Sequence, residues 1–475
     1  MSFAILLLRW GLAAVSMLAV VYVAVYQLLQ LLMMAFAWRE VRSGLRQRRL
    51  EVASAAAASG ELPGISVLVP AYNEQASICR TVETLLAQNH DDIEVVVVSD
   101  GSTDRTLATL RDRYDLFLAG DLPPSGPIPT QAVRAVLRSR ADPRLVVVDK
   151  RNGGKADALN VGINTATRPL VCVIDADVVL DPWALMHLAY PFVEDATTVA
   201  SSGTIRLQNG CRVERGRVTE VDLPDSLVEA IQVLEYVRAF GIGRLFFNAQ
   251  NAHVLISGAF GLFDRSVLVE VGGFQPNAIG EDMELVLRIH RNLSGRRAYR
   301  ISYVGDALCF TEGPHSLSEL GRQRTRWHQG LLTSLRLHAG LLFRPKLGAA
   351  GTLALPYFLL FELLSPVVET VGWVLIPVGL AAGLLPLDTL LAFLAASVLL
   401  GATVSLVALA LDDLALGLFP RLGQLLTLAA WSVLEQFGYH QATLFYRLRA
   451  FPRYYRTIHL KGGWVSPARQ GRAAR

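Results

Sequence analysis

The sequence has little charge for its size: only 18% of its 475 residues are charged, whereas 52% are hydrophobic. Its mean hydropathy of +0.37 excludes an ordinary soluble protein. The net charge of +4 is too small to indicate a nucleic-acid partner. The four cysteines lack Cys-x-x-Cys spacing, so neither a zinc site nor a disulfide framework is indicated and reduced thiols are expected.

The hydrophobicity is concentrated at the two ends, and the first apolar run covers residues 3–37. This run is too long for the apolar part of a cleaved signal peptide. Trp10 and Trp38 bracket it and, at 1.5 Å per helical residue, lie roughly 40 Å apart, which matches a bilayer with its headgroups. We expect one membrane helix over residues 1–38. Five arginines follow the run and one, Arg9, lies near its start, which places the amino terminus outside and the middle of the chain in the cytoplasm.

A basic linker over residues 39–64 leads into a mixed region, residues 65–330, where apolar strand patterns alternate with helix patterns. The expected strands share a run of β-branched residues and lie at 65–69, 93–98, 145–148 and from 170 onward. This alternation predicts an α/β fold with a parallel, doubly wound sheet. The proline-rich stretch 121–130 is expected to be a surface insertion.

The strand that begins at Leu170 ends in two carboxylates, Asp175 and Asp177. In an extended backbone, side chains at i and i+2 point the same way, so both could converge on one cation. Mg²⁺ and Mn²⁺ prefer a few carboxylate oxygens together with phosphate oxygens from a substrate. Taken alone, the pair also fits an acidic loop that happens to follow a strand.

Polar clusters follow the other three strands as well, and in doubly wound sheets ligands bind beyond the carboxyl ends of the strands. Tyr72 could stack on a nucleotide base, while Glu74 and Asp100 could accept hydrogen bonds from it. Lys155 follows two glycines that let the backbone approach closely, which suits a diphosphate. Structural explanations compete with these roles: Tyr72 as a core residue, Lys155 as a solvated surface charge and Asp104 as a helix N-cap.

Six motifs occur in a recognisable order: Pro70–Glu74, Asp100–Asp104, Gly153–Asn160, Asp175–Asp177, Gly280–Asp282 and Gln323–Trp327. This order resembles that of membrane-bound family 2 glycosyltransferases, the group that includes cellulose, hyaluronan, chitin and poly-N-acetylglucosamine synthases. The resemblance covers residues 65–330 and extends to the flanking membrane helices. It implies a GT-A fold, a UDP-sugar donor, Mg²⁺ or Mn²⁺ as cofactor, and inversion at the anomeric carbon.

The resemblance also implies roles for the donor side of the site. It places Tyr72, Glu74 and Asp100 around uridine, and Lys155 near the donor phosphates. Asp175 and Asp177 belong at the diphosphate and the metal, with Asp177 the more direct ligand.

On the acceptor side, the resemblance makes Asp282 the general base that takes the proton from the attacking hydroxyl, with Glu281 beside it. A carboxylate at a helix start is stabilising in any case, so a capping role competes. Gln323, Arg326 and Trp327 share one helix face. Gln323 and Arg326 are expected at the pyrophosphate and Trp327 under a sugar ring. The segment with Ser257, Gly258 and Phe260 resembles the floor of the acceptor site.

After the motifs, residues 331–348 are expected to form an interfacial amphipathic helix, residues 349–446 membrane helices and residues 447–475 a basic cytoplasmic tail. A tail inside requires two or four carboxy-terminal crossings. Residues 351–386 fit one kinked helix or a hairpin. Glu362 and Glu369 are seven residues apart and so share one helix face. They should face the bundle or a water-filled lumen, because an ionised glutamate exposed to lipid is costly in free energy.

The favoured function is a processive synthase in the plasma (inner) membrane that extends a β-linked polysaccharide and exports it. UDP-N-acetylglucosamine is the favoured donor and UDP-glucose stays open. The expected partners are the UDP-sugar, the polysaccharide and membrane lipids, with room for accessory export or regulatory proteins. A non-processive transferase acting on a lipid-linked acceptor is the alternative. A non-catalytic export protein is disfavoured by the intact acids from Asp100 to Asp282.

Overall fold

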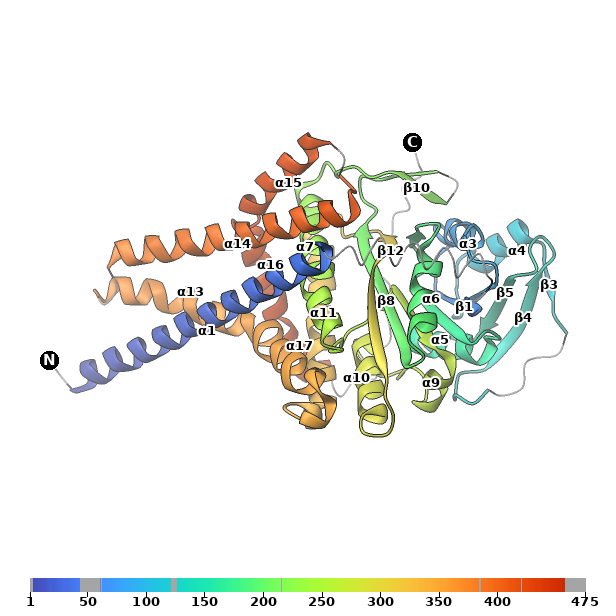
Figure 1. Ribbon diagram of the computed structural model, residues 1–475, viewed down its shortest axis with the longest axis horizontal. Coiled ribbons are helices and arrows are strands. Elements are labelled where there is room, and N and C mark those ends of the chain that lie inside the picture. Colours follow the sequence, from blue (N-terminus) through green and yellow to red (C-terminus); the bar gives the residue numbers. More distant parts are fainter. Residues whose placement is uncertain are drawn as a thin grey trace.

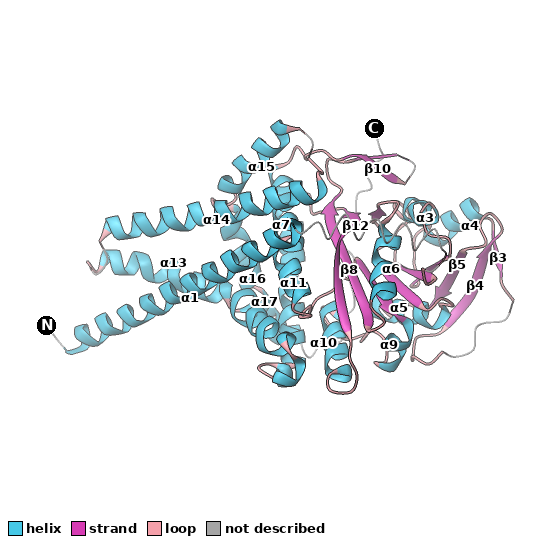
Figure 2. Cartoon of the chain, viewed as in Figure 1, coloured by secondary structure: helices cyan, strands magenta, loops and turns pink. Residues whose placement is uncertain are grey.

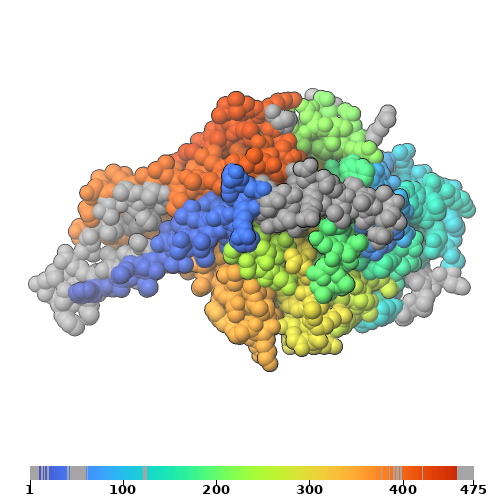
Figure 3. All heavy atoms as spheres, viewed as in Figure 1, coloured from blue at the N-terminus to red at the C-terminus, as the bar shows by residue number. Residues whose placement is uncertain are grey.

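The computed structural model describes residues 3–42, 60, 62–120, 126–214, 216–383, 386–419 and 421–457. The predictions for the basic linker, the proline-rich insertion and the basic tail lie largely outside the described residues, which omit 43–59, 61, 121–125 and 458–475. A body built on one large sheet carries long helices that extend from one side of it (Figures 1 and 2). The space-filling view has the same elongated outline (Figure 3).

The central sheet is mixed, with the strand order β3-β4-β5-β2-β1-β6-β11-β8-β12-β7. In chain order, its strands are β1 (Ile65–Ala71), β2 (Ile93–Ser99), β3 (Leu116–Leu118), β4 (Val133–Ser139), β5 (Leu145–Lys150), β6 (Leu170–Ile174), β7 (Val179–Leu180), β8 (Thr198–Leu207), β11 (Phe260–Asp264) and β12 (Arg300–Thr311). A separate two-stranded sheet pairs β9 (Arg212–Glu214) with β10 (Arg217–Glu220).

The four predicted strands are confirmed as β1, β2, β5 and β6, and they form a continuous parallel block, β5-β2-β1-β6. Alternate residues of this block enter opposite cores: Val67 and Val95 pack on one face, and Leu68 and Val96 on the other. The antiparallel strands β4 and β11 on either side of the block were not predicted. In β4, Arg134 and Arg138 are exposed while Leu137 and Ser139 are buried, as in a half-exposed strand.

Helices cover both faces of the sheet (Figure 2). The helices between β1 and the carboxy-terminal helices are α3 (Ile78–Leu86), α4 (Thr106–Tyr114), α5 (Lys155–Thr165), α6 (Ala184–Glu194), α7 (Leu227–Phe240), α8 (Ile242–Ala249), α9 (Arg265–Glu270), α10 (Glu281–Leu293) and α11 (Leu317–Leu337). The chain continues through η1 (Ala339–Leu341) and η2 (Pro345–Leu347). Helices α5 and α10 begin at the sheet edge where the predicted motifs lie, so this packing positions the candidate site.

Three helical stretches of the described chain are long and apolar enough to cross a membrane: Val21–Arg39, Ala350–Ala381 and Val398–Leu416. The first lies within α1 (Phe3–Arg42) and the last within α14 (Leu387–Leu416). A shorter apolar helix, α15 (Leu422–Leu434), follows, and then α16 (Tyr439–Leu448) and α17 (Ala450–Thr457). These stretches associate the protein with a membrane.

The stretch Ala350–Ala381 is one irregular helix, so the kinked-helix alternative is confirmed over the hairpin. It consists of η3 (Ala350–Ala354), α12 (Leu355–Tyr357), η4 (Phe358–Leu363) and α13 (Ser365–Ala381). The two η segments are π-helical turns. Pro356 and Pro366 begin the regular segments that follow these turns. A proline lacks the N–H that the preceding turn requires, which accounts for the irregular hydrogen bonding.

The prediction of a separate amphipathic helix over residues 331–348 is wrong, because Leu331–Leu337 continue α11. Gly330, the residue before them, does not end the helix and lies inside α11. Its lack of a side chain allows close packing, since a Cβ added to it would lie 3.0 Å from Cα of Gly280. Beyond His338 the chain forms only the short turns η1 and η2, since Gly340, Pro345 and Gly348 interrupt it.

Buried ion pairs join the sheet body to the carboxy-terminal helices. Arg206 of β8 contacts Asp412 of α14, and both side chains are almost fully buried. Arg238 of α7 binds Glu435 and donates a 2.6 Å hydrogen bond to Ser405 Oγ of α14. The body and the helices are therefore docked through desolvated charges as well as apolar packing.

We expect Arg206→Met to lower the free energy of unfolding by about 3–5 kcal/mol, because it removes the cation buried beside Asp412. Chemical denaturation of the protein in detergent measures this change. Arg212→Met is the matched control, since Arg212 is exposed and its ion pair with Glu220 is 4.0 Å long. Equal stability of the two variants would contradict the docking role of the buried pair.

Candidate active site

One cavity of about 2550 Å³ lies at the carboxyl ends of the parallel strands and continues between the body and the long helices. Of the residues that the sequence predicted for the site, twelve line this cavity: Tyr72, Glu74, Asp100, Lys155, Asp175, Ser257, Gly258, Glu281, Asp282, Gln323, Arg326 and Trp327. Residues more than 200 positions apart in the sequence are thus brought to one wall. Asp177 and Phe260 are the exceptions.

Phe260 does not face the cavity, contrary to the expectation that it contacts the acceptor. It is the first residue of β11, pairs with Ile174 of β6 and is 0% exposed. A Cβ added to Gly203 would lie 2.2 Å from its ring, so the side chain fills a tightly packed core position. Phe260 supports the floor segment from within the body, whereas Ser257 and Gly258 line the cavity.

Asp175 and Asp177 lie in a turn, because β6 ends at Ile174. The extended backbone that was expected to align the two carboxylates is therefore absent. Asp175 lines the cavity, whereas Asp177 is 1% exposed behind it. Within the described ranges, no group of three or more His, Cys, Asp or Glu side chains could hold a metal ion. Mg²⁺ is commonly held by one or two carboxylates plus substrate phosphates, and Asp175 provides a carboxylate of that kind.

Lys155 is the first residue of α5 and connects the two halves of the site. Its Nζ donates to Asp175 Oδ1 at 2.6 Å and to the carbonyl oxygen of Gly258 at 3.3 Å, and it lies 3.8 Å from Glu281 Oε1. Burial alone would lower the pKa of Lys155, but the negative charges of Asp175, Glu281 and Asp282 outweigh it and raise the pKa. The ammonium group therefore stays charged at neutral pH. Because the side chain is only 12% exposed and is held by these contacts, Lys155 is not a solvated surface charge.

Asp282 lies at the start of α10, one residue after Glu281. Its Oδ1 accepts a 2.8 Å hydrogen bond from the backbone N–H of Met283, and Oδ2 accepts one of 3.3 Å from the N–H of Gly258. Burial raises the pKa of Glu281, although Lys155 opposes this effect. The helix start thus fixes a carboxylate against the floor segment while leaving it on the cavity wall.

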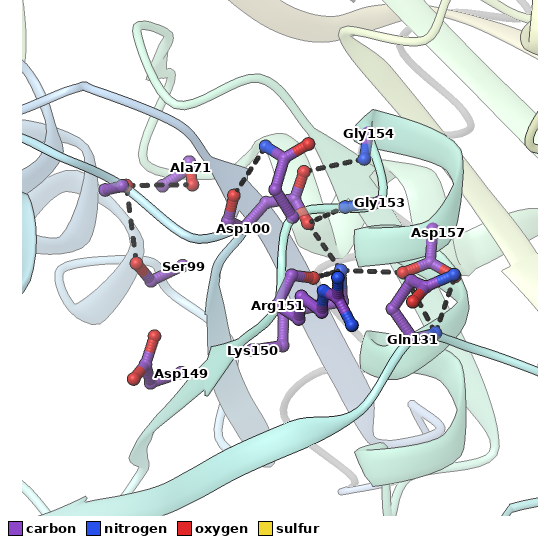
Figure 4. A network of polar contacts seen from close by, with 12 residues as sticks. Ala71, Ser99, Asp100, Gln131, Asp149, Lys150, Arg151, Gly153, Gly154 and Asp157 are labelled. Carbon is purple, nitrogen blue, oxygen red and sulfur yellow. Dashed lines mark hydrogen bonds and ion pairs between the residues drawn. The ribbon is translucent and has the colours of Figure 1, made fainter. Parts of the chain in front are cut away.

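Asp100, expected at the uridine, is only 2% exposed and already engaged. Its Oδ1 and Oδ2 accept hydrogen bonds from the backbone N–H groups of Gly153 at 2.9 Å and Gly154 at 2.8 Å, and it also contacts the Lys150 ammonium (Figure 4). The glycine N–H groups beside Lys155 therefore bind a carboxylate of the protein itself.

Glu74 and Tyr72 are the other residues predicted to contact the nucleotide base. Glu74 is buried and its Oε2 accepts a 2.8 Å hydrogen bond from Ser77 Oγ. Tyr72 is partly exposed on the cavity wall. Asp104 accepts a 2.9 Å hydrogen bond from the backbone N–H of Thr106, the first residue of α4, but the N-cap position is Arg105, so the interpretation of Asp104 as the helix N-cap is wrong by one residue.

Gln323, Arg326 and Trp327 of α11 all line the cavity, as their spacing predicts. Trp327 is 45% exposed. Gln323 Oε1 is buried and has no hydrogen-bond partner among the described residues. An oxygen in this position can accept a hydrogen bond from a ligand in the cavity.

Sequence reasoning missed Arg324, whose guanidinium lies 4.4 Å from the centre of the Trp327 ring. Arg324 is held by Glu235 of α7, which also accepts a 2.7 Å hydrogen bond from Tyr439 of α16. The cation can thus fix the orientation of the ring while leaving it partly exposed. The i, i+3 spacing of Arg324 and Trp327 is a signal that could have indicated their contact. The contact of Arg324 with Glu235 had no such signal, because Glu235 is distant in the sequence.

The cavity continues from the α11 face into the long helices. Glu362 and Glu369 line it, together with Tyr22, Tyr26, Gln27 and Gln30 of α1. Glu369 accepts a 2.6 Å hydrogen bond from Ser365 Oγ and pairs with His440 at 2.8 Å, and Glu362 lies 3.7 Å from Arg447. The glutamates face the bundle as expected, and both take part in contacts between helices.

A parallel strand block thus carries acids and a lysine at its carboxyl edge, and Glu281 of α10 lies 3.8 Å from that lysine. The family described as "Glycosyl transferase family 2" matches residues 66–120, and "Glycosyltransferase like family 2" matches residues 129–330. The chain belongs to glycosyltransferase family 2 and is an enzyme.

Among curated proteins, the chain is similar to poly-beta-1,6-N-acetyl-D-glucosamine synthases. It is 29% identical over 271 residues to that of Staphylococcus aureus strain COL, which covers 57% of this chain and 55% of the relative. The Staphylococcus epidermidis synthase is 28% identical over 270 residues, with 57% and 55% covered. The chain therefore spans about half the length of the curated relatives it matches.

Among solved structures, a mannosyltransferase from Pyrobaculum calidifontis, in complex with GDP-Man and Mn²⁺, is 19% identical with a TM-score of 0.48. That match covers 86% of this chain and 99% of the mannosyltransferase. Staphylococcus aureus TarS is also 19% identical, with a TM-score of 0.34 over 57% of this chain and 40% of TarS.

Proposed function

We propose that this family 2 enzyme transfers N-acetylglucosamine from UDP-N-acetylglucosamine, with inversion, to a growing β-linked polysaccharide and passes the product across the membrane. The observation that carries the proposal is that one continuous cavity extends from Lys155 and Asp175 to Glu362 and Glu369. The similarity to poly-beta-1,6-N-acetyl-D-glucosamine synthases supports the choice of sugar. UDP-glucose is the donor to compare.

In this proposal, Tyr72 and Glu74 contact the uridine, and Lys155 and Arg326, which both line the cavity, hold the diphosphate. Asp175, with Asp177 behind it, would hold Mg²⁺ or Mn²⁺, which when bound neutralises negative charge on the departing diphosphate. Asp282 takes the proton from the acceptor hydroxyl as that oxygen attacks the anomeric carbon and UDP leaves from the opposite face. Trp327 offers a flat apolar surface to the acceptor sugar.

The same proposal places the catalytic body in the cytoplasm and the chain as a multi-pass protein of the plasma (inner) membrane. Arg39 and Arg42 lie in the last turn of α1, on the side of the sheet body. Positive charge next to a membrane helix favours the cytoplasmic side. The glycan would then enter the helices from the cytoplasm.

The proposal is tested by supplying the purified protein in lipid with UDP-N-acetylglucosamine, UDP-glucose and GDP-mannose in separate reactions. Released nucleotide and incorporated sugar are measured with Mg²⁺ and with Mn²⁺. We expect turnover chiefly with UDP-N-acetylglucosamine and a product that a β-N-acetylhexosaminidase digests. Turnover only with another donor would overturn the assignment of the sugar.

A lipid-linked acceptor remains the second candidate, because Glu362 and Glu369 also pair with Arg447 and His440. In that case the glutamates would only hold the helices together and no polymer would pass between them.

We expect Trp327→Ala to shorten or abolish the polymer while UDP binding persists, because the acceptor sugar loses its stacking surface. Glu362→Leu combined with Glu369→Leu should impair polymer appearance in the lumen of inverted vesicles, where exported product collects, more than it impairs sugar transfer at their outer face. Sizing of labelled product on both sides of the vesicle measures both effects. Trp183→Ala is the control, since Trp183 is 48% exposed and does not line the cavity. Normal polymerisation and export by the double variant would favour the lipid-linked acceptor.

A further inference from the structure

Lys150, the last residue of β5, is a charged side chain with no exposed surface. Its ammonium group lies between two carboxylates: it contacts Asp100, and it is 2.6 Å from Asp157 Oδ2 (Figure 4). It also donates a 2.6 Å hydrogen bond to the carbonyl oxygen of Arg151. All three donors of the ammonium group therefore have an acceptor within the protein.

The two carboxylates hold the loop of residues 151–154, which connects β5 to α5. Asp100 accepts from the backbone N–H groups of Gly153 and Gly154, and its carbonyl oxygen accepts a 2.8 Å hydrogen bond from Asn152 Nδ2. Asp157, in the first turn of α5, accepts a 3.0 Å hydrogen bond from the backbone N–H of Gln131. Lys150 thus links both sides of the loop.

The loop packs closely against its neighbours at two glycines. A Cβ added to Gly101 would lie 2.9 Å from the backbone nitrogen of Asn152, and one added to Gly153 would lie 2.4 Å from Asp157 Oδ2. Gly154 has a φ of +89°, a conformation that favours glycine. The ion network and the glycines together specify one path for the backbone just before α5.

Stability alone does not account for a buried cation between two acids. Removing such charges from water is expensive, and well-packed apolar residues of similar volume are often as stabilising. What the network supplies is a defined position for the residue that follows the loop. That residue is Lys155, whose Nζ contacts Asp175 and the carbonyl oxygen of Gly258.

We propose that Lys150 is a positioning residue for donor binding: through Asp100 and Asp157 it fixes the 151–154 loop and places the Lys155 ammonium group at the donor diphosphate. This rests on the proposed function, in which Lys155 contacts the diphosphate. It also gives Asp100 a role inside the protein, as the partner of the loop.

The test uses the full-length protein in detergent with Mg²⁺ and measures nucleotide affinity by calorimetry and stability by thermal unfolding. Lys150→Met is expected to weaken UDP binding about tenfold or more, as is typical when a residue that orients a ligand-binding group is lost. The KM for the donor should rise by a similar factor, while kcat changes less. Asp157→Asn, which keeps the side-chain volume, should weaken UDP binding in the same direction, and the double variant should add little to the single ones.

Arg206→Met is the matched control, because it also breaks a buried ion pair but lies outside the cavity. It should lower stability without changing UDP affinity. If Lys150→Met and Asp157→Asn bind UDP as the unmodified protein does, and only their unfolding temperatures fall, Lys150 is structural and the proposal is wrong. If Lys150→Met does not fold, Asp157→Asn decides the question alone.

Parallel titrations with GDP separate this inference from the proposed function. A preference of the unmodified protein for GDP would overturn the UDP-sugar assignment. The effect of Lys150→Met on whichever diphosphate binds would still decide the positioning role.

Discussion

Asp282→Asn should lower sugar transfer by at least about a hundredfold, the usual contribution of a positioned proton acceptor. The single carbonyl oxygen of the asparagine can still accept the 2.8 Å hydrogen bond from the backbone N–H of Met283, so α10 should keep its place, and only the longer 3.3 Å bond from Gly258 is lost. What is lost is the basic oxygen on the cavity wall. UDP affinity should barely change, because Asp282 serves the acceptor. Initial rates of transfer and calorimetric titration with UDP measure the two quantities.

Asp264→Asn is the control for a purely capping role. Asp264 precedes α9 and its carboxylate accepts from the backbone N–H groups of Ser266 and Val267, away from the cavity. Both variants should lose some stability, and only Asp282→Asn should lose turnover. A loss that arises mainly from weaker UDP binding would show that Asp282 is structural.

The second large loss of turnover is expected when either aspartate after β6 is replaced. Asp175→Asn and Asp177→Asn should each keep the fold and remove metal-dependent turnover, because a carboxamide cannot supply the same anionic ligand to Mg²⁺ or Mn²⁺. Asp175 lines the cavity and also pairs with Lys155, so its replacement should in addition weaken UDP binding. Asp177 is buried, so its replacement should change the metal dependence of turnover. It should change UDP binding in the absence of metal less than the replacement of Asp175 does.

Turnover measured against metal concentration, with excess chelator as the zero-metal reference, separates these contributions. Glu270→Gln is a suitable control, because Glu270 forms surface ion pairs with Arg296 and Arg297. UDP release at the unmodified rate in either aspartate variant, or full activity in chelator, would remove the metal site from the account.

The strands β1, β2, β5 and β6 could be predicted because runs of β-branched residues and the polar turns after them are local signals. The shared face of Gln323, Arg326 and Trp327 follows equally from helical geometry. These local patterns sufficed to bring most of the candidate site to one edge of the sheet.

The rest depends on contacts between residues that are distant in the sequence. Lys150 and Asp100 are 50 positions apart, and nothing in either motif indicates that the aspartate binds inward. Phe260 is buried because its strand, β11, lies between β6 and β8. Asp175 lies in a turn because β6 ends at Ile174. Tertiary packing decides such orientations, and periodicity alone does not report them.

The central claim is that the enzyme extends a polysaccharide while holding it in the cavity. The most direct test is the size of the product made by the unmodified protein in lipid vesicles, with UDP-N-acetylglucosamine in excess and the reaction stopped after few molecules have initiated. The account predicts that long polymer is present among the earliest products and that its length is unchanged when the enzyme is diluted. Products that carry a single added sugar, or that remain attached to lipid, would contradict it.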